Sequence, residues 1–319
     1  MPEAAGTVPD TTNKRSYLKR LGINMIQYKW TYVMLIPVLA YYILFHYLPI
    51  YGVQIAFKDF NPGLGIWGSK WAGLKHFKSF FSGVYAARTI RNTLVINFYN
   101  LVFGFPAPIL LALLLDEIKN VKFKRVTQTV TYLPHFISIV VVCGILIDFA
   151  STKGLFNSII SAFNPNYTPG PLLARANLFR GIYVSSDIWQ GIGWGSIIFL
   201  AALSGVDPEL YEAVMIDGGN RFHRVIHISL PCIFQTIVIM FILRIGQMMS
   251  LGFEKIILLY STSTYETADV ISSYVYRRGL EEFAFSFSAA VGLFNNTINF
   301  ILVNAANYLS RKLTETSLW

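Results

Sequence analysis

The sequence predicts an all-α membrane protein with six transmembrane helices. Of its 319 residues, 54% are hydrophobic and only 13% are charged, whereas soluble domains carry about 25% charged residues. Six apolar runs are each long enough to cross a hydrocarbon core of about 30 Å, which takes about 20 helical residues. A short helix with polar ends is expected between the fourth and fifth runs, on the water side of the membrane.

The first span is placed at Trp30–Phe57. It is too long for the apolar core of a signal peptide, about 7–15 residues, so it is expected to be retained. His46 with Pro49 predicts a bend in this span, and Pro134 with His135 predicts another in the third span. The other five spans are placed at Arg91–Leu115, Tyr132–Ala150, Gly181–Leu203, Cys232–Leu251 and Phe285–Tyr308.

The spans divide the chain into three parts. Residues 1–29 are expected to form a cytoplasmic tail that ends in a helix on the membrane surface, because basic side chains surround Leu18, Leu21, Met25 and Tyr28. Residues 30–310 form the transmembrane domain, and residues 311–319 form a second cytoplasmic tail. Six spans place both termini on one side. Basic residues near the N-terminus and in the 119–125 loop favour the cytoplasm for that side, although the 58–88 loop on the other side is also basic.

Residues 207–231 predict two helical segments joined by a glycine turn. Asp207 can cap the first segment with its carboxylate, and Pro208 fits the first turn, where no N–H is required. Gly218 can take the left-handed conformation that ends this segment. Asn220 can cap the second segment, which leads through Pro231 into the fifth span. The first segment has an apolar face, which favours docking into a groove of another protein.

In this segment, Glu212-Ala213-Val214 is followed after three intervening residues by Gly218, and after nine further intervening residues by Ile228-Ser229-Leu230-Pro231. This order of residues resembles the EAA loop of the membrane subunits of ABC importers. Ile188-Trp189 and Gly193-Trp194 of the fourth span are similar to the carbohydrate branch, and the resemblance covers at least residues 132–235. The long aromatic first span is most similar to permeases for alginate-like polysaccharides. The resemblance assigns ATPase coupling to Glu212, Ala213, Asp217, Gly218, Ile228, Leu230 and Pro231.

This resemblance implies the type I permease fold of ABC importers and a multi-pass location in the bacterial inner membrane. It also implies partners: a dimer of ABC ATPase subunits, a second homologous permease subunit, an extracytoplasmic solute-binding protein and a carbohydrate substrate, besides membrane lipid. ATP and magnesium would be used by the ATPase subunits, and no cofactor is expected in this chain. Closure of the ATPases would move the Glu212–Gly218 helix and switch the spans between inward-open and outward-open states.

Other classes of function are not expected. Cys143 and Cys232 both lie in apolar runs without metal-ligand spacing, so they are interpreted as packing residues. The net charge of +9 comes from basic residues scattered over many loops, which does not predict nucleic-acid binding. The glycine-rich stretch at residues 63–70 lacks the Gly-Lys-Ser/Thr order of a phosphate loop. No nucleophile elbow, metal cluster or carboxylate pair predicts an enzyme.

Polar side chains inside the fourth and last spans are candidates for a solute pathway. Asp187, Gln190 and Trp194 recur at i, i+3 and i+7, which places a carboxylate, an amide and an indole on one helical face. An aromatic ring beside hydrogen-bonding groups suits a sugar, although such residues also anchor span ends at the interface. Asn295 and Asn299 share one side of the last span, where they contact either solute or neighbouring helices.

Arg244 lies near the middle of the fifth span. A permanent charge there costs about 2.5–3.5 kcal/mol unless water or a partner solvates it. Together with Gln247 it can line an aqueous pathway, or it can pair with a carboxylate such as Asp148 or Asp187. Both interpretations remain open from the sequence.

The predicted function is that of a permease subunit for oligosaccharides or polysaccharide fragments, which forms half of the translocation pathway. The basic outer loop and Arg244 raise the hypothesis that the solute is anionic and alginate-like. The alternative is an ion-coupled secondary carrier, for which Asp148, Asp187 and Arg244 are the ionisable candidates within the spans. A membrane-embedded glycan-processing enzyme would require a catalytic pair, which we do not find.

Overall fold

The computed structural model describes residues 27–314. It divides into two compact units, residues 1–54 and residues 55–319, which are treated separately. The expected surface helix around Leu18, Leu21 and Met25 lies outside the described residues. So do residues 315–319 of the expected C-terminal tail.

The first unit consists of the first predicted span. Its helical residues run without interruption into the second unit, so that Lys29–Phe57 form one stretch of 29 residues. The α-helical geometry loosens into a π-turn just before Pro49, because proline lacks the N–H that would continue the ladder. The bend predicted there therefore appears as a change of helix type. The elements are α2 (Lys29–Tyr42), η1 (Ile43–Tyr47), α3 (Leu48–Ile50) and η2 (Tyr51–Phe57).

The second unit begins with a small hairpin. Strands β1 (Lys58–Asp59) and β2 (Lys70–Trp71) pair antiparallel, with Lys58 opposite Trp71 and Asp59 opposite Lys70. The glycine-rich stretch between them forms the short helix α4 (Gly65–Gly68), and Gly65 has a φ of +66°. The helix α5 (Lys75–Phe81) follows.

The second and third spans are each built from several helical pieces. The second comprises α6 (Ala86–Tyr99), η3 (Asn100–Gly104) and α7 (Pro106–Asp116). The third was predicted as one run, Tyr132–Ala150, and this boundary is wrong. Tyr132 ends a separate helix, and Pro134 prevents that helix from continuing. Ser138 then caps the next helix by accepting a hydrogen bond from the Val141 N–H at 3.4 Å. The pieces are α8 (Val121–Tyr132), η4 (Leu133–Phe136), α9 (Ile139–Ala150) and α10 (Leu155–Phe163).

The fourth and fifth spans flank the predicted loop helix. A short turn, η5 (Leu172–Ala174), precedes α11 (Ala176–Leu203), and the chain then bends by 80° into α12 (Pro208–Ile216). The fifth span is a continuous helical stretch from Arg221 to Ile245. The predicted end at Leu251 is wrong, because the helix stops six residues earlier at a turn that Asn299 of the last span holds by hydrogen bonds. The pieces are α13 (Arg221–Arg224), η6 (Val225–Ser229) and α14 (Leu230–Ile245).

The region between the fifth and sixth spans folds into short helices that the sequence patterns did not predict. They are α15 (Phe253–Leu259), η7 (Thr262–Thr264), α16 (Tyr265–Ala268), α17 (Ile271–Tyr276) and η8 (Arg277–Glu281). The last span, α18 (Phe285–Thr314), confirms the sixth prediction and extends it by six residues.

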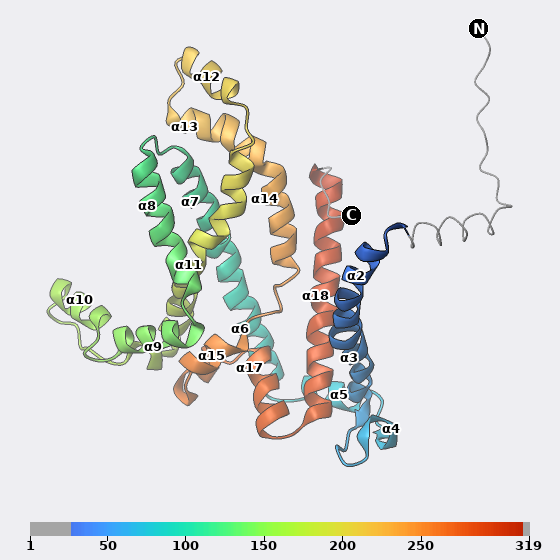
Figure 1. Ribbon diagram of the computed structural model, residues 1–319. Coiled ribbons are helices and arrows are strands. Elements are labelled where there is room, and N and C mark those ends of the chain that lie inside the picture. The colour runs from blue at the N-terminus through green and yellow to red at the C-terminus, as the bar shows by residue number, and fades with distance from the viewer. Residues whose placement is uncertain (1–26, 315–319) are drawn as a thin grey trace, which may run out of the picture. The chain divides into compact units, whose positions relative to one another are not determined.

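The spans give the second unit two distinct ends. Within residues 27–314, five helical stretches are long and apolar enough to cross a membrane, and α11 with α12 passes as a bent pair. Figure 1 places α12 and α13 at one end of the second unit, and α5, α15 and α17 at the other. This arrangement confirms an all-α membrane fold with five to six spans. The side of the membrane on which each end lies stays a prediction.

A buried carboxylate joins the short helices to the second span. Asp269 is fully buried and accepts hydrogen bonds from Arg277 at 2.8 Å to both oxygens and from Arg88 of α6 at 3.1 Å. The Ser273 hydroxyl donates a fourth hydrogen bond at 2.9 Å. Burial alone would lower the pKa of Arg277, but its hydrogen bond to Tyr260 and the Asp269 carboxylate raise it, so the guanidinium stays charged. The network fixes residues 260–281 against α6.

Replacing Asp269 with asparagine is expected to destabilise the chain by about 3–5 kcal/mol, because it breaks the ion pairs of a fully buried carboxylate and leaves two partly buried arginines without their counter-charge. Asp59, which pairs with Lys75 at 2.8 Å on the surface, is the matched control. Its pKa is lowered chiefly by the Lys75 hydrogen bond, yet an exposed pair contributes little. Thermal unfolding of the purified chain in detergent should therefore shift strongly for D269N and hardly for D59N. Equal shifts would show that the buried network is not a major source of stability.

Candidate functional site

A cavity of about 440 Å³ lies between η3, α11 and α14. Three of the predicted pathway residues line it together: Asp187 from α11, and Arg244 and Gln247 from the end of α14 and the turn after it. The volume lies within the range of about 300–1,000 Å³ typical of small-molecule sites. The structure therefore brings side chains from two separate spans to one polar cavity.

The face of α11 that lines the cavity is centred on glycines. Gly191 and Gly195 both lie on it, and Asp187 stands at its edge. Further along the helix, Gly193 packs against the backbone of α8, where any Cβ would collide with the Thr131 carbonyl. Glycine therefore serves two purposes on α11. It leaves room in the cavity on one side and allows close helix packing on another.

Gln190 and Trp194 do not line this cavity with Asp187. Gln190 donates to the Ile137 carbonyl at 3.3 Å, and the Trp194 ring stacks on His135 with centroids 4.6 Å apart and planes 3° apart. Their side chains lie about 60° or less from Asp187 around the helix, but the cavity lies on the other side of Asp187. Spacing alone places the three residues near one another, and it cannot decide on which side the solvent-filled space lies.

The Asp187 carboxylate has two partners. Its Oδ1 pairs with Lys255 Nζ of α15 at 2.5 Å, and its Oδ2 accepts a hydrogen bond from Asn100 at 3.2 Å. The Lys255 ammonium also lies 4.8 Å from the centroid of the Tyr183 ring. Lys255 is a functional candidate that sequence reasoning missed. The available signal was a lone lysine inside the apolar run Phe253–Leu259.

Arg244 does not pair with Asp187 or Asp148. In the part of the chain that the structure describes, its side chain makes no hydrogen bond or ion pair, although it lines the cavity and is half-buried. Its guanidinium therefore has free donors at the cavity, next to the exposed Gln247. Such a group can bind a carboxylate through two parallel hydrogen bonds.

The two asparagines of α18 that are candidates for the solute pathway, Asn295 and Asn299, lie away from this cavity. Asn299 accepts from the Met249 N–H at 2.9 Å and donates to Ser250 at 2.7 Å, so it joins α18 to the turn that follows α14. Asn295 lines a separate cavity of about 420 Å³ between α17 and α18, and its buried Oδ1 has no hydrogen-bond partner there. Neither residue lines the cavity that holds Arg244. Whether they contact solute stays a prediction.

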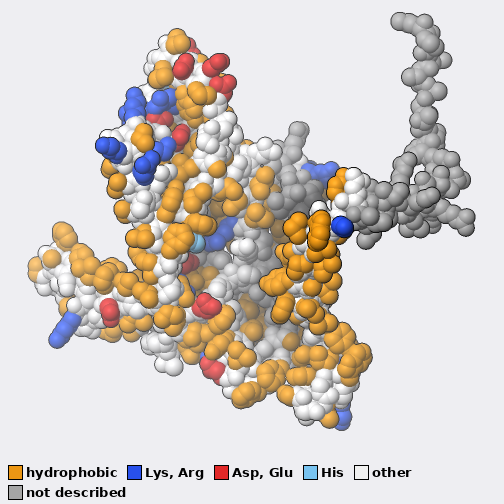
Figure 2. Space-filling view, viewed as in Figure 1, with side chains coloured by type: hydrophobic (Ala, Val, Ile, Leu, Met, Phe, Trp, Pro, Cys, Tyr) orange, Lys and Arg blue, Asp and Glu red, His pale blue; other side chains and the backbone are white. Residues whose placement is uncertain are grey.

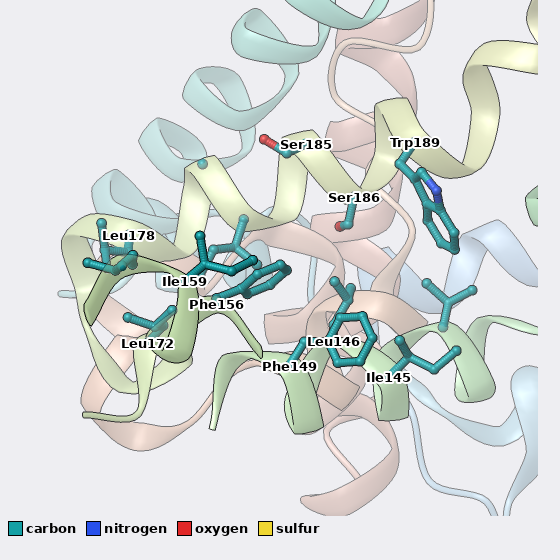
Figure 3. A pocket seen from close by; sticks show the side chains of 14 residues that line it. Ile145, Leu146, Phe149, Phe156, Ile159, Leu172, Leu178, Ser185, Ser186 and Trp189 are labelled. Atoms are coloured by element: carbon teal, nitrogen blue, oxygen red, sulfur yellow. The ribbon is translucent and has the colours of Figure 1, made fainter. Parts of the chain in front are cut away.

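A cavity of about 760 Å³, larger than the one with Arg244, is formed by α9, α10 and α11 (Figure 3). Its walls are mostly aliphatic and aromatic, such as Leu146, Phe156 and Ile159, with only Ser185, Ser186 and the Trp189 indole offering polar atoms. No charged side chain lines it. The smaller cavity with Asp187 and Arg244, which carries the charged side chains, is therefore the candidate functional site. Within residues 27–314, no group of three His, Cys, Asp or Glu side chains can hold a metal ion.

The loop helix has the local structure that the sequence predicts. Asp207 caps α12 by accepting a hydrogen bond from the Glu209 N–H at 3.0 Å, and Gly218 ends it with a φ of +77°. Asn220 caps α13 through a reciprocal pair of hydrogen bonds with His223. Glu212, Ala213 and Asp217, three of the predicted coupling residues, are exposed on or just after α12.

The rest of the predicted coupling segment lies against the spans. Ile228 belongs to η6, and Leu230 and Pro231 begin α14. Arg224 forms an ion pair with Glu117 at the end of the second span, and Tyr211 hydrogen-bonds Ser229 at 3.1 Å.

Charged side chains gather over α12, α13 and the neighbouring end of α8 (Figure 2), whereas orange hydrophobic side chains cover much of the helices beyond. Leu210, Met215 and Ile216 of α12 remain 42%, 52% and 86% exposed. The helix is therefore tied to the spans at its base and free on its outer surface.

Known proteins resemble nearly the whole chain, although no family model matches it. Protein LplB of Bacillus subtilis (strain 168) is 44% identical over 91% of both chains. The polygalacturonan/rhamnogalacturonan transport system permease protein YteP of the same organism is 42% identical over 96% of this chain and 95% of its own. The crystal structure of a bacterial ABC transporter involved in the import of the acidic polysaccharide alginate contains a chain with a TM-score of 0.85 and 40% identity. That match covers 92% of this chain and 99% of the other.

These relatives are transport permeases rather than enzymes, which confirms the predicted class. Similarity over nine-tenths of the length at more than 40% identity leaves no large part of the chain outside the match. The fold, the bent α11–α12 pair and the sequence relationship thus agree. The chain belongs to the membrane-spanning permease subunits of carbohydrate-type ABC importers.

Proposed function

We propose that this chain forms half of the translocation pathway of an importer for acidic oligosaccharides. The observation that carries the proposal is the unpaired Arg244 in a cavity where Lys255 already neutralises Asp187. Of the charged groups that line or touch the cavity, this leaves one positive charge. A uronic-acid oligomer offers carboxylates for the guanidinium and hydroxyls for Gln247 and Asn100.

The relatives support an acidic substrate. YteP is named for polygalacturonan and rhamnogalacturonan transport, and a second related structure is that of a bacterial alginate ABC transporter in complex with an alginate-pentasaccharide-bound periplasmic protein. By analogy, this permease receives its oligosaccharide from an extracytoplasmic solute-binding protein. A second permease subunit completes the pathway from the other side.

We further propose that α12 is the coupling helix. Its capped, rigid body and its exposed Glu212 and Ala213 fit the cleft of a separate ABC ATPase subunit, which would use ATP and magnesium. The α12 end then faces the cytoplasm, as do both termini, and the protein lies in the bacterial inner membrane. The ion pair between Arg224 and Glu117 would pass the motion of α12 to the second span as well.

Purification of the tagged chain from its native membrane in mild detergent tests the proposal. We expect an ATPase and a second permease to co-purify, and uptake to stop on depletion of ATP. Uptake should be inhibited by oligogalacturonate and much less by the same oligomer with methyl-esterified carboxyl groups. A chain recovered alone, with uptake that collapses with ion gradients, would contradict the importer. Equal competition by both oligomers would remove the acidic substrate.

A further inference from the structure

We infer that Lys255 is a specificity-determining residue. Although it does not line the cavity, it sets the sign of the cavity's charge by neutralising Asp187. The inference deepens the proposed function and rests on it for the identity of the solute. Its electrostatic part rests only on contacts within the second unit.

Lys255 is placed so that its charge acts on Asp187 and on little else. Its residue is 4% exposed, and its ammonium contacts the Asp187 Oδ1 at 2.5 Å and the face of Tyr183 at 4.8 Å. Around it lie buried apolar side chains such as Ile256 and Leu259. Because water is excluded there, the ion pair is only weakly screened.

Asp187 differs from Lys255 in that it reaches the cavity. Its side chain is 30% exposed and lines the wall together with Arg244. Without the lysine, the carboxylate would keep its hydrogen bond from Asn100 and its contact with cavity solvent, but no cation would neutralise it. The negative charge of Asp187 would then offset the positive charge of Arg244 and repel an anionic solute.

The charge balance predicts an asymmetric effect of the two single substitutions. With the charges of Asp187, Lys255 and Arg244 counted together, the native net charge is +1. Lys255→Met lowers it to zero, Asp187→Asn raises it to +2, and the double variant restores +1. If the pair served only to fasten α15 to α11, all three variants would lose that link equally.

The cavity charge can be measured without any solute. Gly191 lines the cavity, and a Cβ there would meet no atom within 4 Å, so Gly191→Cys provides a probe thiol. Cys232 is exposed and is first replaced by alanine, whereas Cys143 is buried. We compare the rates of modification by an anionic and a cationic methanethiosulfonate in the purified transporter.

We expect K255M to shift the anionic-to-cationic rate ratio about tenfold toward the cationic reagent. D187N should shift it in the opposite direction, and D187N/K255M should return it to within about threefold of the native ratio. An unchanged ratio in K255M, or equal shifts in all three variants, would overturn the inference. Gel filtration and thermal unfolding show that each variant is folded.

Uptake in cells that carry the whole transporter connects this charge to specificity. Oligogalacturonate uptake should fall about tenfold or more in K255M and less in D187N, and adding D187N to K255M should restore part of the uptake that K255M loses. Uptake of the methyl-esterified oligomer should differ little among these variants. Loss of uptake in all three variants would assign the pair a mechanical role. If the thiol ratios shift as expected while the native transporter ignores oligogalacturonate, the proposed substrate fails and the cavity charge stands.

Discussion

Gly218→Pro is expected to reduce uptake to the background of cells that lack the chain, while the protein still accumulates in the membrane. Gly218 has a φ of +77°, and its N–H donates to the Met215 carbonyl at 3.2 Å. Proline fixes φ near −65° and has no N–H, so the turn that ends α12 cannot form. The spans do not depend on this turn, and only the coupling helix should lose its position.

Gly218→Asn is the matched control, because asparagine tolerates the left-handed conformation better than other residues with a side chain. It should retain most of the uptake. Loss of uptake with asparagine and proline alike would point to a missing contact at the glycine surface rather than to the shape of the turn.

Glu212→Lys tests the same coupling through charge. Glu212 is exposed and makes no hydrogen bond or ion pair within the described residues, so its reversal should leave folding intact. We expect the ATPase to be lost from the complex during purification. Glu281→Lys makes the same charge change near the opposite end of the unit and should leave the complex whole. Retention of the ATPase by the Glu212 variant, with normal uptake, would exclude α12 as the docking element.

Arg244→Gln is expected to lower uptake of acidic oligosaccharide by about ten- to a hundredfold. A hydrogen bond to a charged group contributes about 1.5–3 kcal/mol, and each 1.4 kcal/mol is a factor of ten. Glutamine keeps hydrogen-bonding capacity but removes the positive charge from the cavity. Uptake of a methyl-esterified oligomer should change far less.

Arg311→Gln, at the far end of α18, serves as the control for the loss of one positive charge. Uptake assays at a series of oligosaccharide concentrations should show the effect of R244Q mainly as a higher KM. Equal losses for acidic and esterified oligomers would mean that Arg244 supports the structure of the cavity rather than the recognition of anions.

The sequence predicted those features that depend on local patterns. Apolar runs located the five to six helical spans of residues 27–314, and the cap and glycine turn of α12 and the cap of α13 followed from Asp207, Gly218 and Asn220. Two span boundaries were wrong. Pro134 separates α8 from α9, so the third span begins later than its apolar run, and hydrogen bonds from Asn299 hold the turn at which the fifth span ends before its apolar run does. Helix ends of this kind depend on tertiary contacts such as that of Asn299 with Met249.

The candidate site was only partly predictable for the same reason. Asp187, Arg244 and Gln247 could be proposed, because a polar group in an apolar span needs an explanation. Their common cavity, and the exclusion of Gln190 and Trp194 from it, depend on how α11 is rotated against η3 and α8. Lys255 is separated from Asp187 by 68 positions, and no local pattern connects two residues that far apart.

The contact of Gly193 with the Thr131 backbone makes that point of α11 a fulcrum. At 1.5 Å per residue, Asp187 lies about 9 Å from the fulcrum on one side and Leu203, which leads to α12, about 15 Å on the other. If α11 rotates as a rigid rod about this point, its two ends move in opposite directions, and the displacement at Asp187 is about 0.6 times that at Leu203. A push of about 5 Å at the α12 end would thus displace the cavity wall by about 3 Å in the opposite direction. That displacement is about the length of one hydrogen bond, so under the proposed function one such movement would separate one side of the cavity from a bound oligosaccharide.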